Sequence, residues 1–197
     1  MLRIENSRST MTTLLSLSLA LSVTGTMAAS ESYTLDPTHS YPYFSVNHLG
    51  FSTMQGRFDK TGGKVLLDQA AKTASIDVTS DTASINTGLQ KRDDHLRSPD
   101  FFNTAEFPKA TYKSTAVKFN GSVPATIDGN LTLLGVTRPV TLTVTTFKCG
   151  PNPMNQKATC GVNATGSLKR SDFGMKYALP AVGDDILLTI AVEGVRD

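Results

Sequence analysis

The sequence has no tryptophan, and only 7% of its 197 residues are aromatic. Beyond residue 29 it has no long apolar run, which argues against a membrane-spanning helix in that part. Its 19 basic residues nearly balance its 17 acidic ones and form no cluster, so we expect no nucleic-acid partner. No G-x-S-x-G motif or triad order marks a nucleophilic serine, which argues against a hydrolase. With 15 glycines, the composition favours strands and turns over a helical bundle.

The first 29 residues have the composition of a secretory signal peptide. Arg3 and Arg8 form a basic region, residues 14–23 form a short apolar region, and small residues ending in Ala28-Ala29 provide a cleavage site. Cleavage near Ala28 or Ala29 leaves residues 30–197, a usual size for one domain. We therefore predict an exported protein with a single domain.

The only two cysteines, Cys149 and Cys160, follow the predicted cleavage site. Disulfides form readily in exported proteins, so we predict that these residues form one; free thiols are the alternative. The residues between them are rich in turn formers, and closing a loop of this size contributes about 3 kcal/mol. No histidine or acidic residue accompanies the pair, so neither a metal site nor a cofactor is indicated.

The stretch 39–58 sets the pattern that the rest of the chain repeats. Its aromatic and β-branched residues favour extended backbone, and Pro42 excludes a helix through its start. Phe44, Val46 and His48 share one side of a strand, and Gly50 separates this run from a second one. Two adjoining strands with one apolar face require a further apolar surface to cover that face.

Later segments offer such surfaces, because apolar and polar residues alternate in them. In 123–133 the alternation places Val123, Ile127 and Leu131 on the inward face, and Asn120-Gly121 predicts a two-residue hairpin turn before it. We predict an all-β fold, an up-and-down antiparallel β-barrel of about eight strands with one short helix near an end. A two-sheet sandwich is the alternative. Strands are expected at 32–36, 43–48, 51–58, 64–68, 74–79, 109–119, 123–133, 140–145, 158–168 and 186–192.

Residues 87–99 interrupt the strand pattern and predict one charged surface helix. Thr87 and Gln90 fit a capping box at its start, and Ser98-Pro99 ends it. Only Leu89 and Leu96 are expected to face inward. Phenylalanines follow closely, so the helix and the residues after it are expected to cover one mouth of the barrel: Phe101, Phe102 and Phe107.

Many positions on the predicted inward faces carry small side chains. A barrel of about eight strands fills its interior only if these side chains are large, so we infer an unfilled apolar cavity. The alternative is a flattened barrel in which two walls touch. The small residues are Ala74, Ala83, Ala116, Ala125, Gly129, Ala158, Ala164 and Gly166.

The three histidines do not have the spacing of a metal site. We expect His39 to stabilise a turn, His95 to be solvated, and His48 to lie at the barrel wall, where it would bond a quinone or phenol oxygen. Asp93 and Asp94 are neighbours on a helix and point about 100° apart, which argues against a catalytic dyad. Ion pairs between the helix and the barrel rim are expected instead, among Arg57, Asp93, Asp94, Arg97 and Asp172.

Four stretches, which together cover most of residues 33–194, carry a resemblance to a known family. They read YTLDPTHSYPYFSVNHLGFSTMQGRF, RDDHLRSPDFFNTAEFP, DGNLTLLGVTRPVTLTV and SDFGMKYALPAVGDDILLTIAVEG. The chain resembles the YceI-like family, exported bacterial proteins with a lipocalin-like barrel that bind polyisoprenoid lipids. The resemblance implies a periplasmic protein with an apolar tunnel, a helix near one end and no catalytic set. The cysteine pair departs from the family pattern and is expected to affect only a hairpin tip.

On this resemblance the expected function is a periplasmic carrier or reservoir for an isoprenoid lipid: a quinone, a quinone precursor or a polyprenyl chain. The alternatives are an enzyme acting on a bound quinone or headgroup near His48, and a stress-response protein with a protein partner. Transient contact with a membrane and homodimerisation are further expectations. The residues placed around the ligand are Phe44, Val46, His48, Phe58, Leu89, Leu96, Phe101, Phe102, Ile127, Leu131, Val144 and Ile190.

Overall fold

The structure, a computed structural model, describes residues 30–197. The predicted signal peptide lies outside the described residues and stays a prediction. One α-helix, α1 (Gln90–Arg97), and two short 3₁₀ helices, η1 (Thr82–Ser84) and η2 (Arg170–Phe173), accompany the strands. The strands are β1 (Glu31–Leu35), β2 (Tyr41–His48), β3 (Ser52–Phe58), β4 (Thr61–Asp68), β5 (Thr73–Asp81), β6 (Ile85–Asn86), β7 (Lys109–Asn120), β8 (Val123–Leu133), β9 (Val136–Pro151), β10 (Ala158–Lys169) and β11 (Val182–Arg196).

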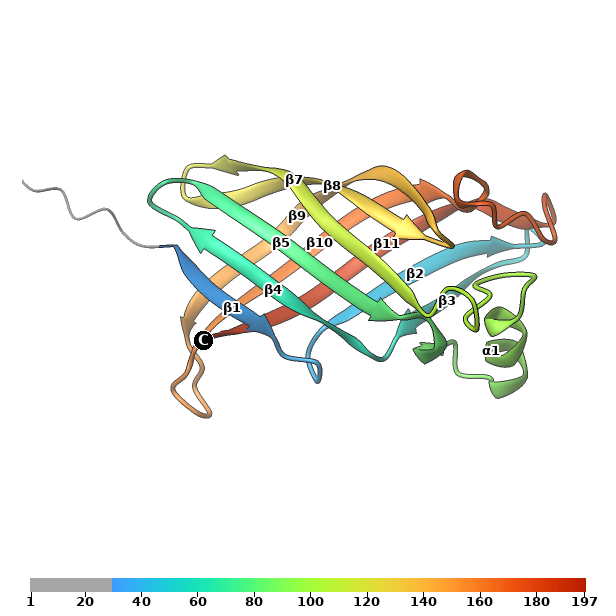
Figure 1. Ribbon diagram of the computed structural model, residues 1–197, viewed down its shortest axis with the longest axis horizontal. Helices are drawn as coiled ribbons and strands as arrows, with labels where there is room; N and C mark the ends of the chain where they lie inside the picture. Colours follow the sequence, from blue (N-terminus) through green and yellow to red (C-terminus); the bar gives the residue numbers. More distant parts are fainter. Residues whose placement is uncertain (1–29) are drawn as a thin grey trace, which may run out of the picture.

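The strands form a closed antiparallel barrel, which confirms the predicted fold (Figure 1). The strand order β1-β4-β5-β7-β8-β9-β10-β11 closes on itself because β1 also pairs with β11. β11 is long enough to pair with β1 near its end and with β2 near its start. Strands β1 and β2 therefore act as one interrupted strand, as do β3 and β4, and the barrel has eight strands.

The two interruptions are held by specific hydrogen bonds. Between β1 and β2, the imidazole Nδ1 of His39 lies 2.8 Å from a carboxylate oxygen of Asp36, as expected for a histidine that stabilises a turn. This hydrogen bond raises the pKa of His39. Between β3 and β4, the backbone N–H of Asp59 donates to the carbonyl of Ser84, which joins the interruption to η1.

The predicted hairpin at Asn120-Gly121 joins β7 and β8, but the inward face at the start of β8 differs from the prediction. The register between β7 and β8 shifts at Lys118/Phe119, so Val123 is exposed and Pro124 is buried. Strict alternation resumes at Ile127. One additional residue in a bulge reverses the side-chain direction, which the apolar pattern alone does not predict.

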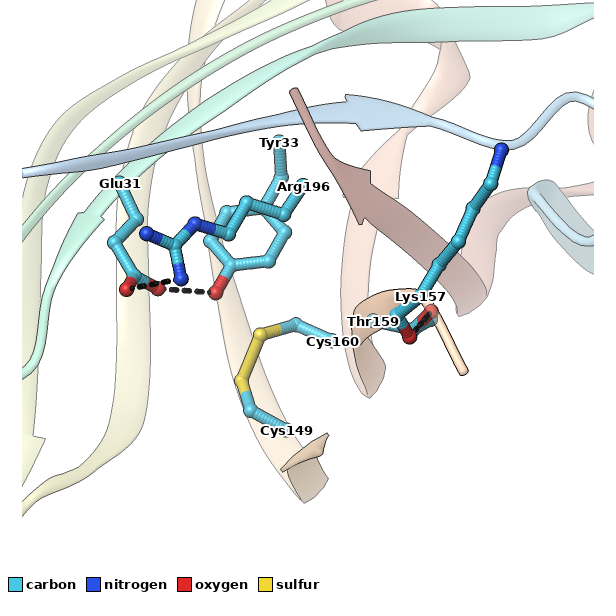
Figure 2. Close-up of a disulfide and its surroundings, with 7 residues drawn as sticks. All are labelled: Glu31, Tyr33, Cys149, Lys157, Thr159, Cys160 and Arg196. Carbon is cyan, nitrogen blue, oxygen red and sulfur yellow. Dashed lines mark hydrogen bonds and ion pairs between the residues drawn. A yellow bond between two sulfur atoms is a disulfide. The ribbon is translucent and has the colours of Figure 1, made fainter. Parts of the chain in front are cut away.

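Cys149 and Cys160 form the predicted disulfide between directly paired residues of β9 and β10 (Figure 2). The sequence placed its effect at a hairpin tip, but the bond lies in the barrel wall, and Cys160 lines the interior. Close by, the hydroxyl of Tyr33 donates to the Glu31 carboxylate at 2.5 Å, and Arg196 pairs with the same carboxylate at 2.9 Å. Burial and Glu31 together raise the pKa of Tyr33 to about 12.

The last residue, Asp197, holds the seam where the barrel closes. Its side chain accepts hydrogen bonds from the hydroxyls of Ser32 and Thr34 and pairs with the ammonium of Lys64 at 3.2 Å. These interactions hold the pKa of Asp197 at about 2, below its ordinary value of 3.8. The chain end thus connects β11 to β1 and β4.

We expect Asp197→Asn to lower the urea midpoint at pH 7 and to have little effect near pH 2. The folded-state pKa lies below the unfolded one, so the contribution of this carboxylate is present above about pH 4 and is lost between about pH 4 and pH 2. Urea titrations at several pH values measure the difference. Asp77→Asn is the control, since Asp77 pairs with Lys113 across β5 and β7, away from the seam. An equal effect in both variants would contradict a special role for the chain end.

Candidate functional site

An apolar cavity of about 300 Å³ occupies the interior of the barrel. Its walls reach from Tyr33 and Cys160, beside the disulfide, to Leu96 and Phe101, on and after α1. All eight strands of the barrel contribute side chains, and almost all of the lining is apolar. A cavity of this kind favours apolar guests, because water finds few hydrogen-bonding partners in it.

Ten of the twelve residues that the sequence placed around a ligand do line this cavity. They come from five strands and from the segment that begins with α1. That they contact a ligand stays a prediction. The ten are Phe44, Val46, Phe58, Leu96, Phe101, Phe102, Ile127, Leu131, Val144 and Ile190.

His48 and Leu89 are the two exceptions. His48 is the last residue of β2, where the strand runs into the β2–β3 turn, and it does not line the cavity. Leu89 is 53% exposed, because the helix begins only at Gln90 and Leu89 itself has extended backbone. His48 pairs with Val182, which does line the cavity, and its action on a bound headgroup stays a prediction.

The start of α1 also differs from the predicted capping box. No side chain caps the helix from Leu89, and the Thr87 hydroxyl instead donates to the carboxylate of Asp93. Asp93 is only 6% exposed and also accepts the backbone N–H of Thr87, so it holds the segment that enters the helix. Gln90 bonds Asp94 on the exposed side.

Among the described residues, none of the predicted ion pairs joins α1 to the barrel rim, and the one pair that forms, Arg97–Asp94, lies within the helix. Arg97 pairs with Asp94 at 2.9 Å, while Arg57 pairs with Asp59 beside β3 at 2.6 Å and does not reach the helix. What attaches α1 to the barrel is the rest of the Arg97 guanidinium, which donates to the carbonyls of Ala83 at 2.8 Å and Ile85 at 3.0 Å. Backbone acceptors of this kind leave no signal in the sequence.

The segment after α1 covers the cavity at this end of the barrel, and its aromatic rings form two groups. In the first, Phe102 packs edge-on against Phe58, with ring centroids 5.4 Å apart, and lies 6.5 Å from Phe44. Phe107, in contrast, lies against Gly135 and does not line the cavity. The predicted cover is therefore formed by Leu96, Phe101 and Phe102.

The second group consists of Phe101, His95 and Tyr177, with ring centroids 5.0 to 5.3 Å apart. His95, expected to be solvated, is half exposed, and its Nε2 lies 3.0 Å from a carboxylate oxygen of Asp100. Tyr177 belongs to the loop between η2 and β11. These rings connect the η2–β11 loop to the side of the cover that Arg97 does not hold.

Arg170 anchors the η2–β11 loop from inside the barrel. It is 3% exposed, and its guanidinium donates to the carbonyls of Gly183, Met175, Tyr177 and Val182 at 2.9 to 3.2 Å. Burial lowers the pKa of this group from its ordinary value. Arg170 was not among the residues predicted from the sequence. The signal for it was its even number, because the inward positions of β10 are even-numbered and Arg170 continues them.

The barrel encloses a cavity, but several of the small residues do not leave the empty space that was predicted beside them. A Cβ at Gly129 would lie 2.4 Å from the ring of Tyr112, so this glycine makes room for a tyrosine lying along the wall. The Tyr112 hydroxyl donates to the carbonyls of Ile127 and Val140, each at 3.0 Å, and burial raises its pKa to about 12. Gly166 accommodates Leu142 in the same way.

The alanines divide between the two faces of the barrel. Ala74 and Ala164 line the cavity as expected. Ala83 and Ala116 are exposed, and Ala125 and Ala158 are half-buried without lining it. Of the eight small residues, only Ala74 and Ala164 therefore border the unfilled space.

Two kinds of feature are absent from the described residues. Within 30–197, no three side chains of the metal-binding types gather at one place. In the same range, no helix combines the length and the apolar character needed to cross a bilayer.

The fold and its interior define a class: single-domain β-barrels that enclose an apolar binding cavity. The profile of the YceI-like domain matches residues 33–194, so the chain belongs to the YceI-like family. It is 38% identical to Protein YceI of Escherichia coli O157:H7 over 180 residues, which cover 91% of this chain and 93% of that protein.

Solved structures share the fold. The Campylobacter jejuni YceI protein is 29% identical, with a TM-score of 0.65 over 77% of this chain and 90% of that one. A polyisoprenoid binding domain from Saccharophagus degradans has a TM-score of 0.63 over 85% of this chain and 99% of that one. At 17% identity the second likeness shows the fold alone.

Gly129→Ala tests the packing of Tyr112 against the wall. The added Cβ displaces the ring and breaks both hydrogen bonds of its hydroxyl, so we expect a loss of about 2 kcal/mol in the free energy of unfolding. Urea denaturation measures it. Gly150→Ala is the matched control, because nothing lies within 4 Å of a Cβ there. If the two variants were equally stable, the ring would not depend on the missing side chain.

Proposed function

We propose that the protein binds an isoprenoid lipid in the barrel and carries or stores it in the periplasm. The observation that supports this most directly is the apolar cavity, which extends from the disulfide to α1 and admits a long tail more readily than a compact polar ligand. A polyisoprenoid binding domain from Saccharophagus degradans has the same fold. The periplasmic location rests on the predicted signal peptide.

Binding is driven by burial of the tail. Transfer of apolar surface from water gains roughly 25 cal/mol per Å², so a tail that buries about 200 Å² gains about 5 kcal/mol. The lining carries one formal charge, on Arg170, and four backbone carbonyls accept its hydrogen bonds. The tail therefore provides the affinity, while quinones, quinone precursors and polyprenyl chains remain alternative cargoes that differ in the headgroup.

We propose that the lipid enters and leaves the cavity through the end of the barrel that α1 covers. One side of the cover is fixed by the hydrogen bonds of Arg97 to Ala83 and Ile85. The other side meets the η2–β11 loop through the rings of Phe101, His95 and Tyr177. Aromatic contacts of this kind contribute about 1 kcal/mol each and are the weaker attachment, so this side is expected to open.

Mass spectrometry of an organic extract tests the proposal, using protein purified from the periplasm without detergent. We expect one isoprenoid species in a stoichiometric amount. Leu188 lines the cavity and its neighbour Leu187 is 59% exposed on the outer face of β11, which gives a matched pair of substitutions. Leu188→Asp places a charge in the cavity and should lower the lipid content at least about tenfold, whereas Leu187→Asp should not.

Leu188→Phe serves as a second variant in case the aspartate prevents folding. It fills cavity volume without adding charge and should also lower the lipid content. Folded wild-type protein that yields no isoprenoid above background would overturn the proposal. Equal lipid content in the Leu187 and Leu188 variants would overturn the assignment of the cavity.

A further inference from the structure

Two turns at the α1 end of the barrel expose apolar side chains. In the β2–β3 turn, Leu49 is 50% exposed and Phe51 is 90% exposed. In the η2–β11 loop, Tyr177 is 48% exposed. Figure 1 shows both turns at the end of the barrel that also carries α1, away from the β9–β10 connection. We call Leu49, Phe51 and Tyr177 the apolar rim.

The apolar rim is continuous with the covered end of the cavity. The backbone N–H of Leu49 donates to the carbonyl of Ala181 at 2.9 Å, which joins the β2–β3 turn to the η2–β11 loop. In that loop, the ring of Tyr177 lies 5.3 Å from the ring of Phe101, a residue that lines the cavity. Any surface that contacts the apolar rim therefore also lies next to Phe101, one of the residues that cover the cavity.

The charge of the same segments is unusual for a protein surface. Residues 37–58 and 174–183 contain no aspartate or glutamate, and the one lysine among them is Lys176. Of the carboxylates that border these segments, Asp36, Asp59 and Asp184 bond neighbouring side chains, whereas Asp172 in η2 is exposed. Exposed apolar side chains beside a lysine, on turns that themselves carry no acidic residue, suit the surface of an anionic bilayer.

We propose that the apolar rim docks on an anionic lipid bilayer and inserts Phe51 and Leu49 into its interfacial region. The proposal rests on the proposed function and extends it by naming the surface at which cargo is exchanged. Two inserted side chains and one lysine give weak, reversible binding, as a carrier requires. Three side chains on two short turns do not supply the roughly 800 Å² per partner that a stable protein interface buries.

The absence of tryptophan allows a direct test, because a single introduced tryptophan reports on its own surroundings. Phe51→Trp places the fluorophore on the apolar rim. Met154→Trp is the matched control: Met154 is 91% exposed and lies in the β9–β10 connection, at the opposite end of the barrel. The probe is a vesicle of phosphatidylglycerol and phosphatidylethanolamine with brominated acyl chains.

On addition of vesicles, we expect the emission of Trp at position 51 to shift to the blue and to be quenched by bromine, with no change at position 154. Equal responses at both positions, or none at position 51, overturn the proposal. A blue shift at position 51 that grows with protein concentration and without vesicles also overturns it, because a second copy of the chain would then cover the rim.

Vesicle flotation of protein without the fluorophore gives a second readout. Phe51→Ser with Leu49→Ser should weaken binding at least about tenfold, and Lys176→Gln should weaken it only on vesicles that contain phosphatidylglycerol. The lipid content of each sample, measured by mass spectrometry, separates the two proposals. Lipid-loaded protein that does not bind vesicles overturns docking alone, and protein that binds vesicles through the rim but never contains isoprenoid overturns the cargo alone.

Discussion

The pairing of β1 with β11 is the constraint on which the rest of the structure depends. Once these two strands meet, the sheet has no free edge along the barrel, and every strand must direct one face inward. The alternation of apolar and polar residues then has a single consistent reading, in which the apolar faces surround a common interior. The chain end strengthens this closure, because Asp197 bonds residues of β1 and β4 just beyond the last paired residue of β11.

Closure also explains the position of the cover. The interrupted strand β3–β4 pairs with β5 only along β4, and β3 pairs with the two-residue β6 instead. The wall is therefore incomplete beside β3, and the segment from Thr82 to Pro108 fills it. Backbone hydrogen bonds fix this segment at both ends, since Ser84 accepts from Asp59 and the N–H of Thr82 donates to Pro108. The helix and the phenylalanines after it are thus placed over the interior by a break in the barrel wall.

The parts of the fold that sequence predicts are those governed by a repeating period. Alternation predicted the strands, the closed barrel and the seven strand residues that line the cavity among the twelve placed around it. The errors lie where one local event changes the phase: a bulge that exposes Val123, a helix that starts one residue after Leu89, and a strand that ends at His48. The prediction that glycines leave empty space was wrong at Gly129 for a different reason. A missing side chain at Gly129 is compatible with an empty space or with a neighbour's ring, and only the three-dimensional structure shows that Tyr112 lies there.

Interactions of different strength surround the two ends of the cavity. At one end, the covalent Cys149–Cys160 bond and the Tyr33–Glu31–Arg196 cluster hold neighbouring strands together (Figure 2). At the other, rings of the cover meet rings of a loop, with no hydrogen bond between His95 or Phe101 and Tyr177 among the described side chains. Parting the first end would disrupt barrel strands, whereas parting the second separates only surface segments. This difference supports the proposed exchange of a lipid tail at the α1 end, the end that also carries the exposed Phe51 and Leu49.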